Sequence, residues 1–351
     1  MKILVLPGDG IGPEITLATL TVLDRANEKF KLGLEWDRRE MGLTTLKKVG
    51  STLPDDVMEA ARKAPGIILG PVDHLIYPSR EQGGINPSGE FRVKLDLFAN
   101  IRPAKSRMGL GLTGKPIDLV IFRECTEGFY ADRNMFMGRG EFMPTEDMAI
   151  AVRKVTARQC ERITRVAFDW ARKRRKKVTA VHKANVFHMS DGLFLREVRK
   201  VAKEYPDVEL DEKIVDAMAA LLVRHPDKFD CIVTGNMFGD ILSDEASEIS
   251  GGLGLAGSTM AGDDACCAQA QHGSAPDIQG QDKANPVSLM LSAAMLFDWL
   301  AMRHKRPEFD HAAKAIEAAI DAALQKPETR TPDIGGKLGT QAFAKHVATL
   351  V

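Results

Sequence analysis

The sequence lacks the features that mark membrane proteins and dedicated nucleic-acid binders. No apolar run approaches the about 18–20 residues that a membrane-spanning helix requires. Lys plus Arg and Asp plus Glu number 48 each, so the formal net charge is zero, which argues against nucleic acid or an anionic membrane as the main partner. Met1-Lys2 leads into a short apolar run and then Pro7, so we expect no signal peptide and a cytoplasmic location.

Two further absences concern cysteine and glycine motifs. The five cysteines are odd in number and have no C-x-x-C spacing, which predicts reduced thiols rather than a disulfide framework. The first glycine-rich stretch, Gly8-Asp9-Gly10-Ile11-Gly12, has the form G-x-G-x-G and therefore lacks the fingerprint of a Rossmann dinucleotide site.

What the sequence does contain is an alternation of short aliphatic runs and amphipathic stretches, which predicts an α/β protein with helices covering a sheet. At 351 residues the chain exceeds the about 250–300 residues at which single cores stop growing, so we expect two lobes. The expected strands are 2–6, 66–69, 119–122, 178–181 and 230–234. The expected helices are 12–29, 55–63, 157–173, 191–203, 212–225, 286–304 and 308–325.

Two segments outside this alternation are distinctive. The polar, Met-rich stretch 132–147 carries Gly138 and Gly140 and is typical of a protruding loop or arm. The basic run Arg172–Lys177 follows an expected helix, where positive charge suits the negative end of the helix dipole. We therefore interpret this run as a solvated helix end rather than a nucleic-acid site.

A cluster of carboxylates is the most informative feature. In Val233–Asp244 an apolar strand ends in a Gly-Asn turn, and a helix is expected from about Phe238, which places Asp240 and Asp244 on one helix face. A third carboxylate, Asp216, lies among apolar residues of another expected helix. Oxygen ligands without cysteine or histidine suit Mg²⁺ or Mn²⁺. An acidic pair favoured by the helix dipole is the alternative, and it explains Asp240 better than Asp244.

Three arginines lie at the ends of expected elements. Arg92 and Arg102 flank the apolar passage that leads to Pro103, and Arg123 ends the strand 119–122. The guanidinium fork matches carboxylates, so the three together could hold a di- or tricarboxylate, although each one alone would be interpreted as a surface salt bridge. Tyr130 follows closely and is a candidate proton donor.

In order along the chain, these motifs resemble the β-decarboxylating dehydrogenases, the isocitrate/isopropylmalate dehydrogenase family. The resemblance runs from Leu6-Pro7-Gly8-Asp9-Gly10-Ile11-Gly12 to Asp333-Ile334-Gly335-Gly336, and the wording of 235–247 and 272–278 is closest to 3-isopropylmalate dehydrogenases. It implies a two-lobed α/β fold with a central mixed sheet, not a Rossmann fold. The expected first lobe, on the NAD side, comprises 1–98 plus 253–351. The expected second lobe, 99–252, carries the metal ligands, the dimer interface and an arm near 131–147.

The resemblance also implies an activity: NAD-linked, Mg²⁺- or Mn²⁺-dependent oxidative decarboxylation of a 3-substituted malate by a homodimer with shared active sites. The best match is a 3-isopropylmalate dehydrogenase. Isocitrate, homoisocitrate and tartrate/D-malate dehydrogenases are the alternatives. A non-catalytic regulatory subunit is disfavoured, because such subunits tend to lose the lysine, tyrosine or metal carboxylates. Neither nucleic acid nor a membrane is implied as a partner.

Site residues follow from the resemblance motif by motif. Lys183 and Tyr130 would be catalytic, and the metal ligands would be Asp240, Asp244 and a subunit-crossing Asp216. The substrate would meet Arg92, Arg102, Arg123, Ser88, Asn86, Asn185 and Asp216. NAD would lie on Ile11 and on the loop that supplies His272, Gly273, Ser274, Ala275, Asp277, Ile278 and Asn285. Asp277 would accept from the adenosine ribose 2′-hydroxyl, where NADP-dependent relatives typically carry Lys-Tyr in place of Asp277-Ile278.

The chain departs from the isopropylmalate pattern in three places. Ser88 and Gly89 occupy positions where leucines usually pack the isopropyl group, and Asn86 and Ser88 have the residue types that isocitrate enzymes use there in reverse order. The glycine-rich strand end of the family is shortened at 69–73, and a glutamate near the nicotinamide is Gln269. The first departure favours a smaller or more polar side group than isopropyl, and the other two concern the cofactor.

Overall fold

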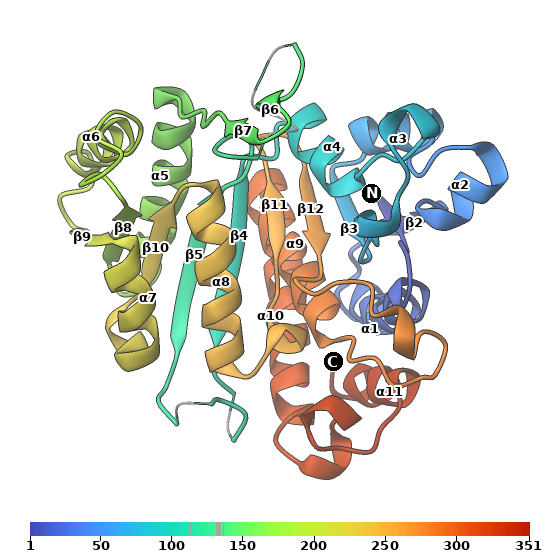
Figure 1. The fold of residues 1–351 in the computed structure, drawn as a ribbon. Coiled ribbons are helices and arrows are strands. Elements are labelled where there is room, and N and C mark those ends of the chain that lie inside the picture. The colour runs from blue at the N-terminus through green and yellow to red at the C-terminus, as the bar shows by residue number, and fades with distance from the viewer. Residues whose placement is uncertain (108, 113, 131–134, 136) are drawn as a thin grey trace. The chain divides into compact units, whose positions relative to one another are not determined.

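The computed structural model describes residues 1–107, 109–112, 114–130, 135 and 137–351. These residues form two compact units. Unit 1 comprises Met1–Leu95 and Leu253–Val351, and unit 2 comprises Asp96–Gly252. Both contain mixed β-structure with helices packed on it, so the predicted α/β fold class is confirmed (Figure 1).

Unit 1 is built on strands in the order β2-β1-β3-β12-β11. All neighbours are parallel except β11 and β12, which are antiparallel. The strands are β1 (Lys2–Leu6), β2 (Glu35–Arg38), β3 (Gly66–Leu69), β11 (Thr259–Ala261) and β12 (Cys266–Gln269). The helices are α1 (Gly12–Phe30), α2 (Leu43–Val49), α3 (Asp55–Lys63), α4 (Pro87–Lys94), α9 (Val287–His304), α10 (Pro307–Ala323) and α11 (Thr340–Leu350). The core helix is α9, whose apolar side chains pack on β12, β3 and β11.

Unit 2 has strands in the order β4-β5-β10-β8-β9, with β4 antiparallel to β5 and the others parallel. The strands are β4 (Ala99–Lys105), β5 (Asp118–Glu124), β8 (Lys177–His182), β9 (Glu209–Ile214) and β10 (Cys231–Thr234). Helices α5 (Ala157–Arg172) and α6 (Ser190–Ala202) contact these strands on one face. Helices α7 (Val215–Arg224) and α8 (Asn236–Ser250) cover the other face (Figure 1).

The topology of unit 2 gathers the polar motifs at one edge. Strands β5, β8 and β10 run parallel, so their carboxyl ends lie together. Arg123 lies near the end of β5, Lys183 directly follows β8, and α8 with Asp240 follows β10. Ligand sites in α/β proteins form at such carboxyl ends, so this edge is where chemistry is expected.

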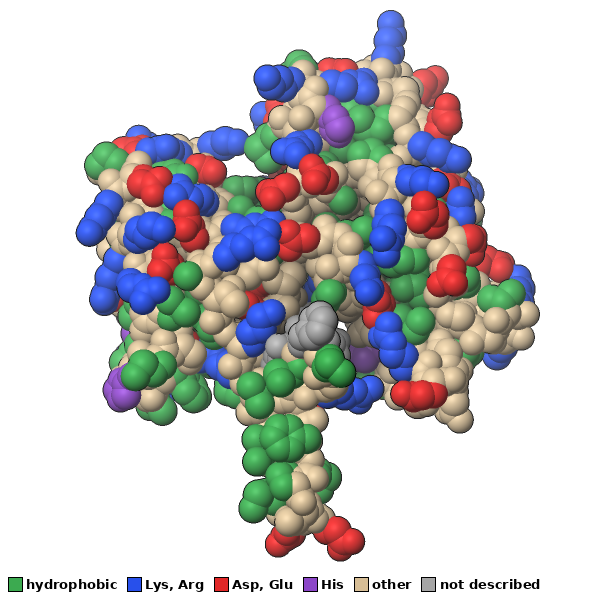
Figure 2. All heavy atoms as spheres, turned by 90° about the horizontal axis from the view of Figure 1, so that it is seen from above, with side chains coloured by type: hydrophobic (Ala, Val, Ile, Leu, Met, Phe, Trp, Pro, Cys, Tyr) green, Lys and Arg blue, Asp and Glu red, His purple; other side chains and the backbone are tan. Residues whose placement is uncertain are grey.

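A two-stranded hairpin projects from unit 2. It pairs β6 (Glu141–Thr145) with β7 (Met148–Ala151), and every residue of both strands is exposed. Its exposed side chains include Phe142, Met143, Met148 and Ile150, and Figure 2 shows an apolar projection that ends in acidic side chains. Strand β6 lies in the segment predicted as a protruding arm, near 131–147, and β7 extends the hairpin beyond it to Ala151; residues 131–134 and 136 of the segment fall outside the described residues.

The main error in secondary structure concerns the expected helix 212–225. Its first residues belong to the strand β9, which pairs with β8 from Lys177↔Glu209 to His182↔Ile214, and helix α7 starts only at Val215. The charged sequence Glu-Leu-Asp-Glu-Lys-Ile has helical propensity, but backbone pairing with β8 and an edge position that tolerates charge favour a strand.

Several other expectations can be compared with the structure. All five cysteines are free and buried. In the basic run, Arg172 and Lys176 pair with Asp207, Arg174 pairs with Asp118 and Asp230, and Lys177 pairs with Glu209. Among the described residues, no helix is long and apolar enough to cross a membrane.

Candidate active site

The two carboxylates of α8 converge on one arginine. Arg102 Nη1 lies 3.3 Å from Asp240 Oδ1 and 3.0 Å from Asp244 Oδ1. The same nitrogen also donates to Ser243 Oγ at 2.7 Å. Two carboxylates one helical turn apart repel each other, and the guanidinium that both contact offsets this repulsion. The predicted pairing of Asp240 and Asp244 on one helix face is therefore present.

Arg123 is the most deeply buried member of the site, with a side chain that is 1% exposed. Its Nε and Nη2 donate to Asn236 Oδ1 at 2.9 and 2.6 Å, and its Nη1 contacts Asp240 Oδ1. A buried charge is tolerated only with such partners. Helix α8 approaches β5 closely here because residue 239 is glycine: a Cβ at Gly239 would lie 2.7 Å from both Cβ and Cγ of Arg123.

Arg102 and Arg123 form a positively charged corner with unused hydrogen-bonding capacity. Burial lowers the pKa of Arg102, and the neighbouring Arg123 lowers it further, while Asp240 and Asp244 oppose this shift. Arg102 Nε is buried and meets no acceptor within the described part of the chain. Such a corner is suited to an anionic ligand, and a carboxylate matches the guanidinium geometry.

Tyr130 reaches the same carboxylate from the loop after β5. Its hydroxyl donates to Asp240 Oδ2, and Arg123 Cζ lies 5.3 Å from the centre of its ring. The phenol is therefore held beside Asp240, with the Arg123 guanidinium over its ring.

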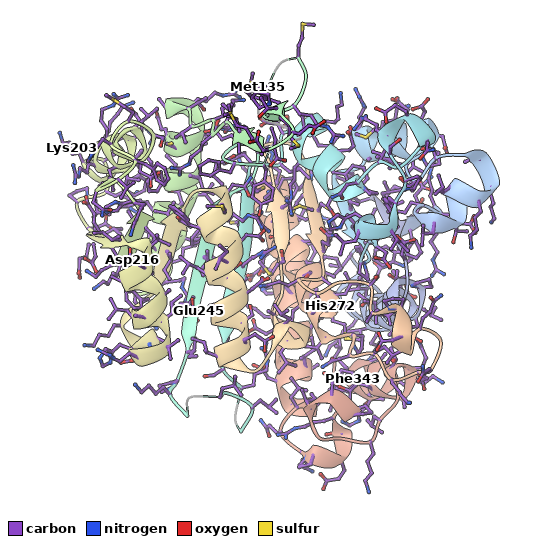
Figure 3. The ribbon with its side chains drawn as sticks, in the orientation of Figure 1. Met135, Lys203, Asp216, Glu245, His272 and Phe343 are labelled. Atoms are coloured by element: carbon purple, nitrogen blue, oxygen red, sulfur yellow. The ribbon has the colours of Figure 1, made fainter. Side chains whose placement is uncertain are left out.

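Lys183 and Asp216 meet each other instead of the α8 carboxylates. Lys183 Nζ lies 2.6 Å from Asp216 Oδ1, and this contact lowers the pKa of Asp216. Asp216 lies in the first turn of α7 and is 70% exposed, contrary to the expectation of a carboxylate among apolar residues (Figure 3). Helix α7 turns its apolar side chains, among them Met218 and Leu222, toward the core. Asn185 is exposed in the turn after Lys183.

Within one chain, the three predicted metal ligands do not come together. No group of three or more His, Cys, Asp or Glu side chains in the described residues is arranged to hold a metal ion. Asp240 and Asp244 supply converging oxygen donors, and Asp216 faces solvent.

In unit 1, the residues predicted to bind the substrate lie on and around α4. Asn86 Oδ1 accepts from Ser88 N at 3.1 Å and from Gly89 N at 3.4 Å, so it caps this helix. Ser88 is 8% exposed, and its hydroxyl lies 3.0 Å from Oε1 and 2.8 Å from Nε2 of Gln269. Arg92 Nε contacts Met260 Sδ at 2.9 Å. At one of the positions where the isopropylmalate pattern has leucine, the buried Ser88 is thus hydrogen-bonded to the half-buried Gln269.

The predicted cofactor residues of unit 1 form two joined loops. Ile11 N donates to Ser274 O at 2.8 Å, and a Cβ at Gly10, where φ is +56°, would lie 2.0 Å from that oxygen. Burial lowers the pKa of His272, whose Nε2 has no partner among the described residues (Figure 3). Asp277 is exposed on the same loop. The N-terminal glycines therefore serve close backbone approach to this loop.

The other residues predicted to bind NAD follow along the same loop. Gly273 is exposed, Ile278 is half-buried, and Ala275 has a φ of +38°, which is unusual for a residue with a side chain. Asn285 Nδ2 donates to Asp333 Oδ2 at 2.9 Å, and its Oδ1 accepts from Val287 N at 3.0 Å. The Asn285 amide is therefore fixed in one orientation.

Several further polar residues, which no predicted motif contains as a site residue, connect the segments of the two units through hydrogen bonds within each unit. Asn236 joins Arg123 to the Glu127 carbonyl, and Asp9, 5% exposed, accepts from Leu43 N, Asp73 N and the Tyr77 hydroxyl. A cavity of about 30 Å³, room for about one water, is lined by Glu127, Arg153, Cys160, Asp191 and Phe238 among others. Burial, with Glu124 nearby, raises the pKa of Glu127 to about 7. Their partners come from segments that are distant in the sequence, so no local pattern identifies these groups.

A family of dehydrogenases matches this α/β fold with its arginine corner and paired carboxylates. The family model described as isocitrate/isopropylmalate dehydrogenase matches residues 2–347. The chain belongs to the isocitrate/isopropylmalate dehydrogenase family, and it is a decarboxylating dehydrogenase, as the sequence predicted.

Similar proteins span the substrate range of the family. A homoisocitrate dehydrogenase of Methanocaldococcus jannaschii is 41% identical, with 100% of this chain and 98% of the relative covered. A 3-isopropylmalate dehydrogenase of Archaeoglobus fulgidus is 38% identical over 100% of this chain and 99% of the relative. The crystal structure of isocitrate dehydrogenase from Methylococcus capsulatus superimposes with a TM-score of 0.86 at 37% identity, covering 99% and 98% of the two chains.

Proposed function

We propose that this enzyme catalyses the Mg²⁺- or Mn²⁺-dependent, NAD-linked oxidative decarboxylation of a 3-substituted malate. The observation that carries the proposal is the convergence of Arg102, Arg123 and Tyr130 on Asp240 at the carboxyl ends of the unit 2 strands. That arrangement offers carboxylate recognition, oxygen ligands for a hard cation and a proton donor in one place.

The donors of α8 fit a divalent cation. Asp240 and Asp244 already share one cationic nitrogen, so their oxygens are close enough to share a metal ion. A bound Mg²⁺ would supply Lewis acidity toward the hydroxyl and carboxylate oxygens of the substrate. Arg102, Arg123 and Arg92 would then bind the substrate carboxylates, including the one that leaves as CO₂.

The protein's own groups would move two protons. Lys183 would remove the proton from the substrate hydroxyl. The carbon that bears this hydroxyl would transfer a hydride to the nicotinamide. The resulting β-keto acid loses CO₂ by cleavage of the bond to its C3 carboxylate. Tyr130 would then protonate C3, giving a 2-oxo acid. The contact of Tyr130 with Asp240 supports this role, because it holds the phenol at the carboxylate cluster.

The cofactor preference rests on Asp277. Its exposed carboxylate, on the loop joined to Ile11 through Ser274, would accept from a ribose 2′-hydroxyl and repel a 2′-phosphate. NAD is therefore the proposed cofactor. Its other predicted contacts on this loop are His272, Gly273, Ala275, Ile278 and Asn285.

Two candidate substrates differ in the side group of the malate. The 3-isopropylmalate dehydrogenases among the relatives make 3-isopropylmalate the first candidate. The buried Ser88 and the half-buried Gln269, which hydrogen-bond each other, favour a second candidate, a malate with a polar substituent such as isocitrate or homoisocitrate, because polar side chains offer hydrogen-bond partners to a polar substituent and none to an apolar one.

The working unit would be a homodimer with shared active sites. Lys183 and Asp216 pair with each other, and Asp216 is exposed. Both side chains would therefore complete the site that Asp240 and Asp244 form in a second copy. The β6–β7 hairpin has no buried residue in a single chain, and isolated two-stranded hairpins are marginally stable in water. A second copy that covers its apolar side chains would account for both features.

The test is NADH production from 3-isopropylmalate, isocitrate, homoisocitrate, D-malate and tartrate with Mg²⁺, each with NAD and with NADP. Asp240→Asn should abolish turnover at saturating Mg²⁺ while the melting temperature shows a folded protein. Near-normal activity of Asp240→Asn would remove the metal assignment. No turnover of any of the five acids by the wild type would instead support a regulatory subunit.

A further inference from the structure

Arg153 is a largely buried cation with no role in the proposed chemistry. Its side chain is 13% exposed, and its Nη2 lies 2.6 Å from Asp191 Oδ1, whose side chain is 3% exposed. Its Nη1 also donates to Ser190 Oγ at 3.1 Å. A buried ion pair is weak evidence for stability, because both ions lose their hydration, so its purpose has to be sought in what it holds.

Three aromatic rings surround the Arg153 guanidinium. Its Cζ lies 5.5 Å from the ring centre of Phe129, 5.1 Å from that of Phe187 and 5.5 Å from that of Phe238. Guanidinium groups bind ring faces at such distances. The three rings come from three chain segments that follow β5, β8 and β10.

Each ring is close in sequence to a residue of the candidate site. Phe129 directly precedes Tyr130, Phe187 belongs to the turn that starts at Lys183, and Phe238 lies one half-turn of α8 before Asp240. One guanidinium thus contacts the segments that carry the proposed proton donor, the proposed base and a proposed metal ligand.

Asp191 adds a direct link to the lysine. Its Oδ2 accepts from the backbone amide of Lys183 at 2.5 Å, while its Oδ1 binds Arg153. The turn closes on itself, because Phe187 N donates to Lys183 O at 2.9 Å and Asp191 N donates to Phe187 O at 3.0 Å. The start of the lysine side chain is therefore fixed through Asp191 to Arg153.

We propose that Arg153 and Asp191 are positioning residues, which hold Lys183, Tyr130 and the first turn of α8 in register through the aromatic rings and the Lys183 amide. This inference rests on the proposed function and adds to it the residues that keep its parts aligned. Misplacement of reacting groups by about 1 Å can lower a rate about 100-fold, so the pair should affect kcat more than binding.

The chain supplies a matched control at the opposite end of the same strands. Asp230, 1% exposed, accepts from Arg174 Nε at 2.7 Å and from the Arg175 backbone amide at 2.8 Å. Like Asp191 it accepts from one arginine and one backbone amide, with Arg175 Nε 3.9 Å away as a further cation, but it lies at the amino ends of β8 and β10. A purely structural role would make the two aspartates equivalent.

The experiment compares Asp191→Asn with Asp230→Asn. An asparagine at 191 can still accept from the Lys183 amide but turns its own NH₂ toward Arg153, so the link is broken. We expect Asp191→Asn to lower kcat about 10- to 100-fold with the KM for NAD within twofold, and Asp230→Asn to lower only the melting temperature. Equal kcat values in both variants would overturn the proposal.

Two further measurements keep the result interpretable. Arg153→Lys retains a cation for Asp191 but loses the planar contact with the rings, so it should fold and lose kcat to a smaller extent. Amide hydrogen exchange should rise across 183–187 in Asp191→Asn and not in Asp230→Asn, and unchanged exchange would contradict the link without any assay of turnover. If the wild type turns over none of the acids, the proposed function fails, while the exchange result still decides whether Asp191 holds this turn.

Discussion

The close approach of α8 to β5 leads to a sharp prediction for Gly239→Ala. Alanine in a helix interior is favoured over glycine by about 1 kcal/mol. Here the new Cβ would lie 2.7 Å from Cβ and Cγ and 3.2 Å from Cα of Arg123, a side chain that is 1% exposed. These atoms are next to the β5 backbone and cannot rotate away, and overpacking of this kind costs about 1–3 kcal/mol.

The overpacking cost of about 1–3 kcal/mol, less the propensity gain of about 1 kcal/mol, predicts that Gly239→Ala destabilises the protein by up to about 2 kcal/mol. For a chain of 351 residues this lowers the melting temperature by up to roughly 3 °C. Asp240 is the next residue and moves with the helix, away from its contacts with Arg102, Arg123 and Tyr130. The Mg²⁺ concentration for half-maximal NADH production should rise about tenfold, since 1.4 kcal/mol in binding is a factor of ten. Thermal unfolding and a Mg²⁺ titration of activity measure the two effects separately.

The control is Gly192→Ala in α6. No heavy atom lies within 4 Å of a Cβ built at Gly192, so this variant gains helix propensity without a clash. It should be as stable as the wild type or more stable by up to about 1 kcal/mol, with an unchanged Mg²⁺ requirement. The packing argument is refuted if Gly239→Ala matches Gly192→Ala in melting temperature and in Mg²⁺ dependence.

Two more predictions concern pH and cofactor choice. The pKa of Glu127 is raised from 4.5 to about 7 in the folded protein, so its contribution to stability is fully present below pH 4.5 and is lost as pH rises through 7. The melting temperature of Glu127→Gln relative to wild type should therefore rise between pH 5 and pH 8, and a constant difference would show that Glu127 does not titrate there. Asp277→Lys with Ile278→Tyr should shift the ratio of kcat/KM values from NAD toward NADP, and an unchanged ratio would mean that the 2′-hydroxyl is bound elsewhere.

Sequence patterns identified the elements that depend on local apolar runs. The strands β1 and β3 were placed with their observed bounds, because continuous aliphatic residues between turn signals indicate buried parallel strands. Strand β9 was missed because its ladder with β8, not its own charged sequence, determines the conformation. The short β11 and β12 carry too few residues for any periodicity.

The residues of the site likewise divide into those that local spacing predicts and those that depend on the tertiary fold. Helical spacing was enough to predict that Asp240 and Asp244 share a face, since that is a local property of α8. The surroundings of Arg153 could not be predicted, because its rings come from three segments that only the tertiary fold brings together. The exposure of Asp216 was equally hidden, because it depends on where α7 begins after β9.

The discontinuous strand order of unit 1 has a consequence for synthesis. Strand β3 is paired on one side by β1 and on the other by β12, where Gly66 pairs with Cys266. At about 5–20 residues per second, a ribosome needs roughly 10–40 s to make the chain between them. Unit 2 is a single continuous segment and can complete its fold during this interval. The nascent chain thus carries an unpaired, apolar edge of β3 for roughly 10–40 s, and chaperone protection during translation is expected at this edge.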